Sequence, residues 1–386
     1  MSDVVIAGIG QVPVGEHWEL SLRTLATRAI RQAMRDSGGL QPQAMYIGNF
    51  LSPVVSHQTN LGALLADNSG LEGIEAFTVE AAGASGAGAL RLGFMAVASG
   101  FVDCAVVVGV EKVTDLVGPG LEAAISESMD YDYEAINGLT QAGLAALAAQ
   151  RYLYEYQAPR RFLAEFPLLA HANAVNNPNA MYRKVVRREV YAAAEMLCDP
   201  LNLFDTAPYA DGAAAVILTR PNCIPAANQH RLVKITGSNV AIDTLALHDR
   251  PDMLAFQAVT VSTQQACRQA GILPEDVDFF ELCDSFSIYA VLSLEAAGFA
   301  ERGQGWKLAE SGDLALGGKL PILTMGGNKA RGYPLAASGI YQVVEAVQQL
   351  RGDAGANQVR GARRGLVQSL GGPASTVVTH VLESVG

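Results

Sequence analysis

Five cysteines are the first residues of this chain whose side chains could perform covalent chemistry, as nucleophiles or as metal ligands. They are odd in number and widely spaced, without a Cys-x-x-Cys pair: Cys104, Cys198, Cys223, Cys267 and Cys283. This pattern fits neither a disulfide framework nor a zinc site. Cys283 stands out because it lies between an expected strand end and an expected helix start, where a lowered pKa would make its thiol a base or a nucleophile. The alternative is a neutral thiol that lines a pocket.

Two further segments place reactive side chains among small residues. Segment 79–90 runs from an expected strand into a helix, whose first turn offers unpaired N–H groups to a negative charge. Its Ser85 lies in Gly-Ala-Ser-Gly-Ala, which misses the hydrolase nucleophile elbow at the last residue, so a helix-start role is expected. Segment 326–339 is a glycine loop that carries Tyr333. The unperturbed pKa of a tyrosine is about 10, so Tyr333 needs strong local tuning to act as a base, and a structural hydrogen bond is the alternative.

Familiar cofactor and metal motifs are incomplete or missing in the sequence. Segment 8–13 follows an expected strand, but Pro13 stands where a dinucleotide fingerprint needs glycine or alanine. The sequence contains neither a Gly-Lys-Ser/Thr phosphate loop nor a His-Glu-x-x-His motif. We therefore expect neither a nicotinamide cofactor nor a metal.

Composition and charge exclude several classes of protein. The 386 residues are 50% hydrophobic and 17% charged, which predicts a large core and excludes a disordered chain. A net charge of −11 argues against a nucleic-acid partner. No apolar run reaches the ~18 residues of a membrane span, and the N-terminus lacks the pattern of a signal peptide. The sequence therefore predicts a cytoplasmic protein that does not cross a membrane.

The elements that must position these residues alternate between strands and helices. Strands are expected at 4–8, 45–50, 76–80, 103–110, 213–218, 232–240, 277–282, 321–325, 365–370 and 376–382. Helices are expected at 20–37, 85–98, 139–156, 160–174, 255–271, 285–297 and 334–350. The alternation indicates an α/β protein with a largely parallel sheet, covered on both faces.

The order of elements suggests two similar halves, 1–225 and 226–386, joined by a linker at 221–225. Between about 111 and 200 the alternation stops. An insertion of this length usually has its own structure and often covers an active site. We therefore expect a loop domain inserted into the first half.

Segments 79–90, 281–286 and 326–339 together resemble those of the thiolase superfamily, in particular the archaeal and sterol-carrier-protein type. The regions around Asn173 and Asp205 resemble the family's linking segments, so the resemblance covers nearly the whole chain. It implies a five-layered αβαβα thiolase fold, a tight homodimer, and carbon–carbon chemistry on a coenzyme A thioester.

The chain differs from the family at three catalytic positions. Gly83 stands where the family has its nucleophilic cysteine, Cys283 where it has the histidine of His-Asp-x-Phe, and Tyr333 where it has the histidine of Gly-His-Pro. Without a nucleophile at position 83, an acyl-enzyme has no obvious start.

Thiolase-fold retro-aldolases of steroid side-chain degradation are similar in lacking the cysteine and in carrying tyrosines for the histidines, although Cys283 stands where they have a second tyrosine. The resemblance implies retro-aldol cleavage of a β-hydroxyacyl-CoA, in which Tyr333 handles the hydroxyl proton. Cys283 and N–H groups near Gly83 and Gly372 would face the thioester oxygen. Asp284 is assigned to the same site, with orientation of neighbouring segments as its simpler role.

Two alternatives remain open: an acetyl-CoA acyltransferase that uses Cys283 as a displaced nucleophile, and a non-catalytic subunit of a complex. Archaeal-type thiolases often associate with a small zinc-bearing OB-fold protein, so the resemblance implies such a partner. The phosphates of coenzyme A need cations, for which the basic stretch offers Arg183, Lys184, Arg187 and Arg188. A solvated helix face is the alternative for these four.

Overall fold

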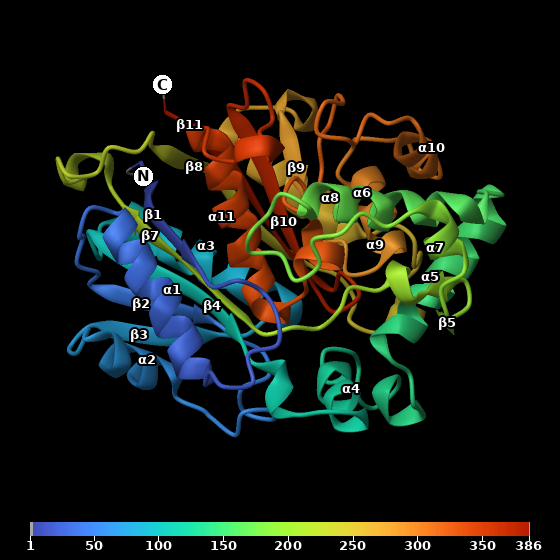
Figure 1. The fold of residues 1–386 in the computed structure, drawn as a ribbon, viewed down its shortest axis with the longest axis horizontal. Helices are drawn as coiled ribbons and strands as arrows, with labels where there is room; N and C mark the ends of the chain where they lie inside the picture. The colour runs from blue at the N-terminus through green and yellow to red at the C-terminus, as the bar shows by residue number, and fades with distance from the viewer. Residues whose placement is uncertain (1–2, 386) are drawn as a thin grey trace.

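The computed structural model describes residues 3–385 as a layered α/β protein (Figure 1). Its first half contains five strands and three helices that the sequence pattern largely locates. They are β1 (Val5–Gln11), α1 (Leu22–Asp36), β2 (Ala44–Gly48), α2 (Leu61–Ser69), β3 (Glu75–Val79), α3 (Ser85–Ser99), β4 (Cys104–Glu111) and β7 (Gly212–Thr219). The expected strands and helices of this half are confirmed, and α2 is an addition.

The second half largely repeats this order of elements, without a counterpart of β3. It contains β8 (Val233–Ile242), α8 (Gln257–Ala270), β9 (Phe279–Glu281), α9 (Ser287–Ala296), α10 (Gly305–Glu310), α11 (Ser338–Arg351), β10 (Arg364–Gly371) and β11 (Thr376–Ser384). The strand expected at 321–325 is wrong. Only Ile322 forms an isolated parallel bridge, to Phe280. Pro321 has no N–H to donate to a ladder, and the chain enters the glycine loop directly afterwards.

Nine of the described strands form one continuous sheet with two parts, in the order β3-β2-β4-β7-β1-β8-β11-β10-β9. The largely parallel sheet expected from the alternation is wrong, because only β2–β3, β2–β4 and β9–β10 pair in parallel and the other five pairings are antiparallel. The short turn between β10 and β11, for example, permits only antiparallel pairing. The two parts meet where Val5 and Ile6 of β1 pair with Lys234 and Val233 of β8. Helix α1 packs against β1, β4 and β7, α8 packs against β8 and β11, and α3 and α11 contact each other between the two parts. This arrangement is the five-layered αβαβα fold expected from the sequence.

Burial explains why the central strands have no polar face. All eight residues of β4 and all eight of β7 are buried, because helices cover both faces of that part of the sheet. Helix α1 instead buries one stripe that includes Leu22, Leu25 and Ile30, as expected for an outer layer. The central helix α11 is buried around nearly its whole circumference.

The two central helices are entered through matching turns. A short 3-10 turn, Ala82–Ala84, precedes α3, and another, Leu335–Ala337, precedes α11. Each turn begins with a non-glycine residue of positive φ, +48° for Ala82 and +34° for Leu335. Each helix then begins with serine and glycine. The two halves therefore place equivalent turns beside each other at the centre of the molecule.

The helix starts approach so closely that glycine is required. A Cβ atom on Gly86 would overlap the carbonyl oxygen of Ala336, and one on Gly339 would lie 2.8 Å from the backbone nitrogen of Ala87. These contacts bring the first turn of α3 against the turn that precedes α11.

The insertion between β4 and β7 lies against the second half, as the green segment of Figure 1 shows. It contains α4 (Pro119–Ser126), α5 (Gln141–Tyr156), α6 (Glu165–Ala174), α7 (Arg188–Ala192), β5 (Met196–Cys198) and β6 (Leu201–Asn202). Helix α5 contacts α9, and α6 contacts the glycine loop. The domain boundary near residue 225 stays a prediction. Within residues 3–385, no helix is long and apolar enough to cross a membrane.

Candidate active site

The three segments singled out in the sequence meet at one small cavity. Its wall takes Gly83 from the first segment, Ser285 from the second, Tyr333 from the third, and Gly372 from the turn after β10. The rest of the lining is Phe50, Ile125, Ser128, Gln141, Tyr209, Phe286 and Leu335. The fold thus joins residues that are nearly 300 positions apart in sequence.

The hydroxyl of Tyr333 occupies the space that a side chain at position 83 would need. A Cβ atom built on Gly83 would lie 2.7 Å from the Tyr333 hydroxyl oxygen and 2.6 Å from the carbonyl oxygen of Leu370. Both separations are shorter than ordinary packing allows. Glycine at 83 and tyrosine at 333 are therefore physically linked, since the tyrosine in this position excludes any larger residue at 83.

Tyr333 is held firmly while its hydroxyl remains without a protein partner. Its backbone N–H donates to Pro208 at 2.9 Å, and its ring lies 6.0 Å from the ring of Tyr209. No described residue hydrogen-bonds to its hydroxyl. Burial, followed by the nearby Cys283 and Tyr209, raises the pKa of Tyr333 well above its usual value. The phenol therefore keeps its proton near neutral pH and faces the cavity as a hydrogen-bond donor.

Cys283 lies beside this cavity but does not line it. The Asn328 side-chain amide donates to its Sγ at 3.5 Å, and its Sγ lies 3.8 Å from Ser285 Oγ. Burial raises the pKa of Cys283, and the hydrogen bonds that favour its thiolate do not outweigh burial. The raised pKa favours the neutral thiol over the reactive thiolate that the sequence suggested.

Asp284 holds the glycine loop in place through hydrogen bonds to the loop backbone. Its carboxylate accepts the backbone N–H groups of Asn328 at 2.6 Å and Lys329 at 3.3 Å. A Cβ atom on Gly327 would lie 2.7 Å from Asp284 Oδ2. These contacts are typical of a residue that positions the loop, and a catalytic role for Asp284 stays a prediction.

Lys329 is a buried cation that the sequence analysis did not single out. Its Nζ donates to the backbone oxygen of Asp205 at 2.5 Å, and burial lowers its pKa to about 8. The charge of Asp284 is the strongest influence that opposes this shift. Lysine in a glycine loop usually indicates phosphate binding or solvent exposure, so the sequence offered no sign that this one is buried.

Ser85 of the first segment and Gly372 of the turn after β10 organise the backbone around the cavity. The Ser85 hydroxyl donates to Ala82 O at 2.6 Å and accepts from the Ala81 N–H at 2.8 Å, which confirms its expected role at the helix start. Gly372 has a φ of +55°, and a Cβ atom there would lie 2.7 Å from Ser128 O. The N–H of Gly372 bonds to no described residue and lies at the cavity wall.

Glu111, at the end of β4, anchors the turn before α11. Its carboxyl group accepts from Asn49 Nδ2 at 2.8 Å, from Leu51 N–H at 3.0 Å and from Ala336 N–H at 3.3 Å. Burial raises its pKa to about 8. The sequence analysis missed it because a glutamate at a strand end carries no recognisable spacing.

A second cavity of about 200 Å³ reaches Tyr333 from the insertion. It shares Tyr209, Ser285, Phe286 and Tyr333 with the first cavity. The insertion contributes Glu122, Ala142 and Leu197 to its wall. The inserted segment therefore covers the site, as the sequence predicted. No group of three or more metal-binding side chains occurs in the described part of the chain.

The basic stretch lies at the surface. Arg183, Lys184 and Arg187 are exposed in an irregular loop between α6 and α7, and none lines either cavity beside Tyr333. Arg188 pairs with Glu165 at 2.8 Å. The expected helix face is absent at 183–187, and a role of these side chains in binding coenzyme A stays a prediction.

Comparisons with protein families agree with this architecture. The model "Thiolase, N-terminal domain" matches residues 4–222, and "Thiolase C-terminal domain-like" matches residues 239–384. The two matches cover nearly the whole chain in the order expected for two halves.

Relatives extend over the same length. The acetyl-CoA acetyltransferase of Methanothermobacter thermautotrophicus is 41% identical over 383 residues, covering 99% of each chain. The benzoylsuccinyl-CoA thiolase subunit BbsB of Thauera aromatica is 31% identical, covering 92% of this chain and 91% of its own. A solved structure described as "Ltp2-ChsH2(DUF35) aldolase" superposes with a TM-score of 0.85 at 24% identity, covering 99% of this chain and 98% of its own. That last likeness shows the fold alone.

Proposed function

The chain belongs to the thiolase superfamily, and from that premise we propose that it cleaves a β-hydroxyacyl-CoA by a retro-aldol reaction, without an acyl-enzyme. The relatives support an enzyme of thiolase type that acts on an acyl-CoA. The retro-aldol reaction is proposed from this chain's own residues.

One observation carries the proposal: the Tyr333 hydroxyl stands 2.7 Å from where the Cβ atom of a residue at 83 would be. A thiolase nucleophile needs a side chain at that position, and the tyrosine leaves no room for it. A retro-aldol reaction needs no acyl-enzyme, but it needs a group that moves the hydroxyl proton and donors for the enolate oxygen.

The proposed step balances within the substrate. The β-hydroxyl loses its proton, its oxygen becomes a carbonyl, and the Cα–Cβ bond breaks with its electron pair left on the acyl-CoA as an enolate. Tyr333 accepts the hydroxyl proton as it releases its own, and the released proton finally reaches the α-carbon, so Tyr333 ends the cycle as it began. A neutral phenol suits this relay because it both accepts and donates. The N–H of Gly372 and the backbone at Gly83 would hold the enolate oxygen.

Product analysis tests this proposal. Incubation with β-hydroxyacyl-CoA substrates is expected to release an aldehyde or ketone and a shorter acyl-CoA in equal amounts. Release of neither product by the wild-type protein, with or without an added partner, would contradict it. Undiminished turnover in Tyr333→Phe would remove Tyr333 from the mechanism.

The identity to an acetyl-CoA acetyltransferase favours a second candidate, an acyltransferase that uses Cys283 as its nucleophile. The burial of Cys283 and its raised pKa argue against it. This candidate predicts a covalent acyl group on Cys283 after exposure to acetyl-CoA. A protein with no coenzyme A-dependent activity under any of these conditions would instead be a non-catalytic subunit.

We further propose a homodimer formed through β3. This strand is at the edge of the sheet, so one side of its backbone is unpaired. Phe77 on β3 is 60% exposed, and Leu92 and Met95 on α3 are exposed nearby. A second copy would cover this apolar edge. Light scattering is expected to give the mass of a dimer, and Phe77→Glu to shift it toward a monomer.

A small OB-fold protein is the proposed second partner. The solved aldolase structure includes a DUF35 component in its description, which supports the expectation drawn from the family. Co-purification with the product of a neighbouring gene of that type would test it. The substrate is proposed to be a coenzyme A thioester, and the cytoplasmic location stays a prediction.

A further inference from the structure

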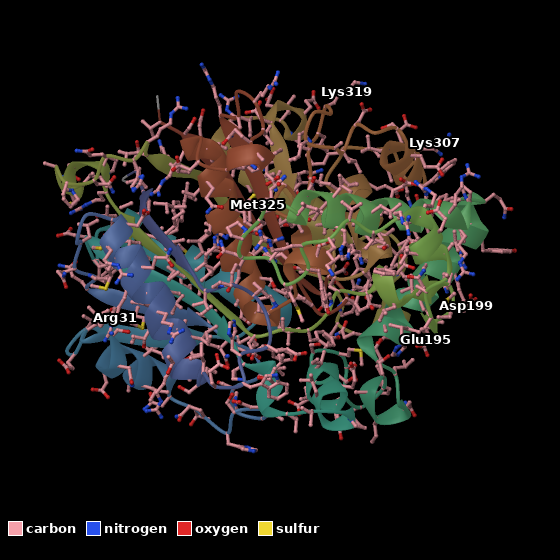
Figure 2. The ribbon with its side chains drawn as sticks, viewed as in Figure 1. Arg31, Glu195, Asp199, Lys307, Lys319 and Met325 are labelled. Carbon is pink, nitrogen blue, oxygen red and sulfur yellow. The ribbon has the colours of Figure 1, made fainter. Side chains whose placement is uncertain are left out.

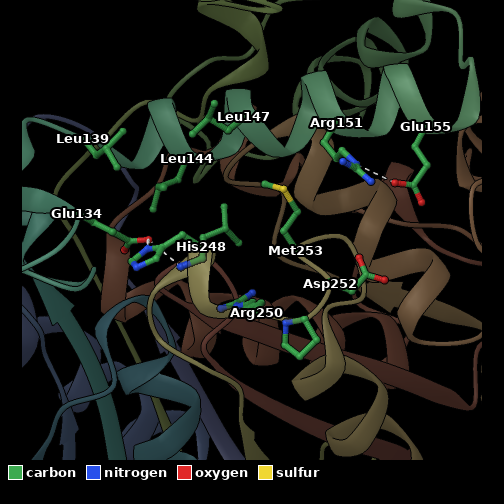
Figure 3. Close-up of a pocket in the computed structure, with 12 residues that line it drawn as sticks. Glu134, Leu139, Leu144, Leu147, Arg151, Glu155, His248, Arg250, Asp252 and Met253 are labelled. Atoms are coloured by element: carbon green, nitrogen blue, oxygen red, sulfur yellow. Dashed lines mark hydrogen bonds and ion pairs between the residues drawn. The ribbon is translucent and has the colours of Figure 1, made fainter.

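A large cavity lies outside the site around Tyr333. It has a volume of about 590 Å³ and is formed between α5 and the segment 247–253 (Figure 3). Figure 3 shows α5 along one side of the cavity and Arg250 on the opposite wall. Twelve residues line it, none of which lines the catalytic cavity.

One wall of this cavity is apolar. Leu139, Leu144 and Leu147 come from the insertion, and Leu247 and Met253 come from the facing segment. Two of these residues, Leu144 and Leu247, also form a small buried cluster with Met129. Such a wall suits an aliphatic chain or a ring.

Most charged groups in the cavity already have partners. Arg151 pairs with Glu155 at 2.8 Å. Glu134 accepts the backbone N–H of Leu247 at 2.7 Å and lies 3.8 Å from His248 Nδ1. Asp252 pairs with Arg302. Figure 2 shows other charged side chains, among them Glu195, Asp199 and Lys307, at the rim of the molecule.

Arg250 is the exception. It is only 7% exposed, and it forms no ion pair with any residue in 3–385. Its Nε donates to Thr244 O and its Nη1 to Pro373 O, both at 2.9 Å, whereas its Nη2 is buried with no partner. Burial lowers the pKa of Arg250, and the charges of Asp243 and Glu134, neither of which forms an ion pair with it, oppose that shift only in part. An anionic ligand would supply the missing acceptor.

We propose that this cavity binds an apolar chain that ends in a carboxylate, with Arg250 as the residue that recognises the carboxylate. The shared chemistry has two sources: the far end of the acyl group of a coenzyme A thioester, or a free carboxylic acid. The first source rests on the proposed action on acyl-CoA, but not on the retro-aldol step.

The position of Arg250 relative to the catalytic cavity favours the acyl group. Pro373, which accepts from Arg250, directly follows Gly372 in the catalytic wall. The insertion contributes residues to the walls of both cavities, Gln141 to the catalytic cavity and Leu144 to this one. An acyl group that extended past the wall between the two cavities would bring its far end to Arg250.

Binding measurements test the proposal without requiring turnover. We compare suberoyl-CoA, whose acyl chain ends in a carboxylate, with octanoyl-CoA, which has a methyl group there, by calorimetry on the full-length protein. The wild type is expected to bind suberoyl-CoA about tenfold more tightly, and Arg250→Met to lose that preference. Octanoate alone is the third probe: binding that depends on Arg250 and competes with suberoyl-CoA would assign the site to free acids as well.

A second pair of variants covers the case in which Arg250→Met fails to fold. Leu147 is half exposed on the cavity wall, so Leu147→Asp is expected to fold and to repel the carboxylate, whereas the matched Leu147→Asn keeps the preference. Equal affinity of the wild type for both thioesters, together with no Arg250-dependent binding of octanoate, would overturn the proposal. So would a preference that survives in a folded Arg250→Met or in Leu147→Asp. Failure of retro-aldol cleavage with the preference intact would contradict only the proposed function.

Discussion

The turn before α3 and the turn before α11 have the same backbone conformation, but the segments that contain them differ in their side chains. Both are 3-10 turns that begin with a residue of positive φ and lead into a central helix. The segment before α3 contains only small residues around Gly83. The segment before α11 carries Asn328, Lys329, Arg331 and Tyr333, all buried.

Because of this difference, the first half contributes backbone groups to the site and the second half contributes side chains. In the thiolase family the first turn provides the nucleophile, whereas in the mechanism proposed here it provides only space and N–H groups. The side chain that fills that space is Tyr333, from the segment directly before the second turn. A fold built from two similar halves can thus move its reactive group from one turn to the other without changing the helices behind them.

Removal of the Tyr333 hydroxyl is expected to reduce activity more than any other single change in the two segments. Tyr333→Phe keeps the ring against Tyr209 but removes the proton relay, so kcat for cleavage is expected to fall by about 10² to 10⁴. Steady-state kinetics with a β-hydroxyacyl-CoA measures it. Tyr209→Phe is the matched control, expected to retain activity within about threefold, and an equal loss in both variants would contradict a special role for Tyr333.

Lys329, the buried cation in the segment before α11, predicts that the stability of the protein depends on pH. The pKa of Lys329 is about 8 in the fold, below its unfolded value of about 10.4. Between these values the unfolded chain binds more protons, so the wild type is expected to gain stability with rising pH relative to Lys329→Met, by roughly 3 kcal/mol in total. Urea unfolding of both proteins from pH 7.5 to 10.5 measures the difference. A difference that does not change with pH would show that the pKa of Lys329 is the same in the folded and unfolded states.

Filling the first turn is expected to disturb both site and fold. Gly83→Ala places a methyl group against the Tyr333 hydroxyl and Leu370 O, so the free energy of unfolding is expected to fall by about 1–3 kcal/mol and activity to drop at least about tenfold. Adding Tyr333→Phe should recover part of the stability, because one of the two contacts is then gone.

The equivalent position in the second turn supplies the control for Gly83. Ala336→Gly adds no atoms and is expected to cost only about 0.5–1 kcal/mol, through backbone entropy. Chemical denaturation compares the variants. A Gly83→Ala protein as stable as the wild type would mean that the tyrosine does not occupy this space.

Cys283 is expected to contribute least. Because its thiol is neutral and lies behind the cavity wall, Cys283→Ala should retain activity within about tenfold, and Cys283→Ser should behave similarly. The same kinetic assay measures both. Complete loss of activity in both variants, in folded protein, would restore Cys283 as a nucleophile.

Sequence patterns predicted the fold well because its central strands are continuous apolar runs, such as 104–110, and its helices have clear periodicity. The strand expected at 321–325 failed because a short apolar run gives no sign of its pairing partners. Segments 79–90, 281–286 and 326–339 were correctly brought to one place by the family resemblance. What the sequence could not show was the contact between Gly83 and Tyr333, because it depends on tertiary packing across the two halves.

Burial also escaped the sequence analysis. Lys329 and Glu111 look like ordinary polar residues in a loop and at a strand end, yet both are enclosed. The basic stretch 183–188 suggested a binding surface because charge is visible in sequence, whereas Arg250, a single arginine among polar neighbours, gave no such signal. Its lack of a partner is evident only once the cavity around it is known.

The central claim is that cleavage proceeds without a covalent acyl-enzyme, and one quenched time course with a β-hydroxyacyl-CoA tests it directly. Mass spectrometry of each time point measures the small-molecule products and the intact mass of the protein together. A carbonyl compound and a shortened acyl-CoA are expected in equal amounts, with the protein unmodified throughout. An acyl adduct on Cys283 that forms and decays at the rate of product release would contradict it.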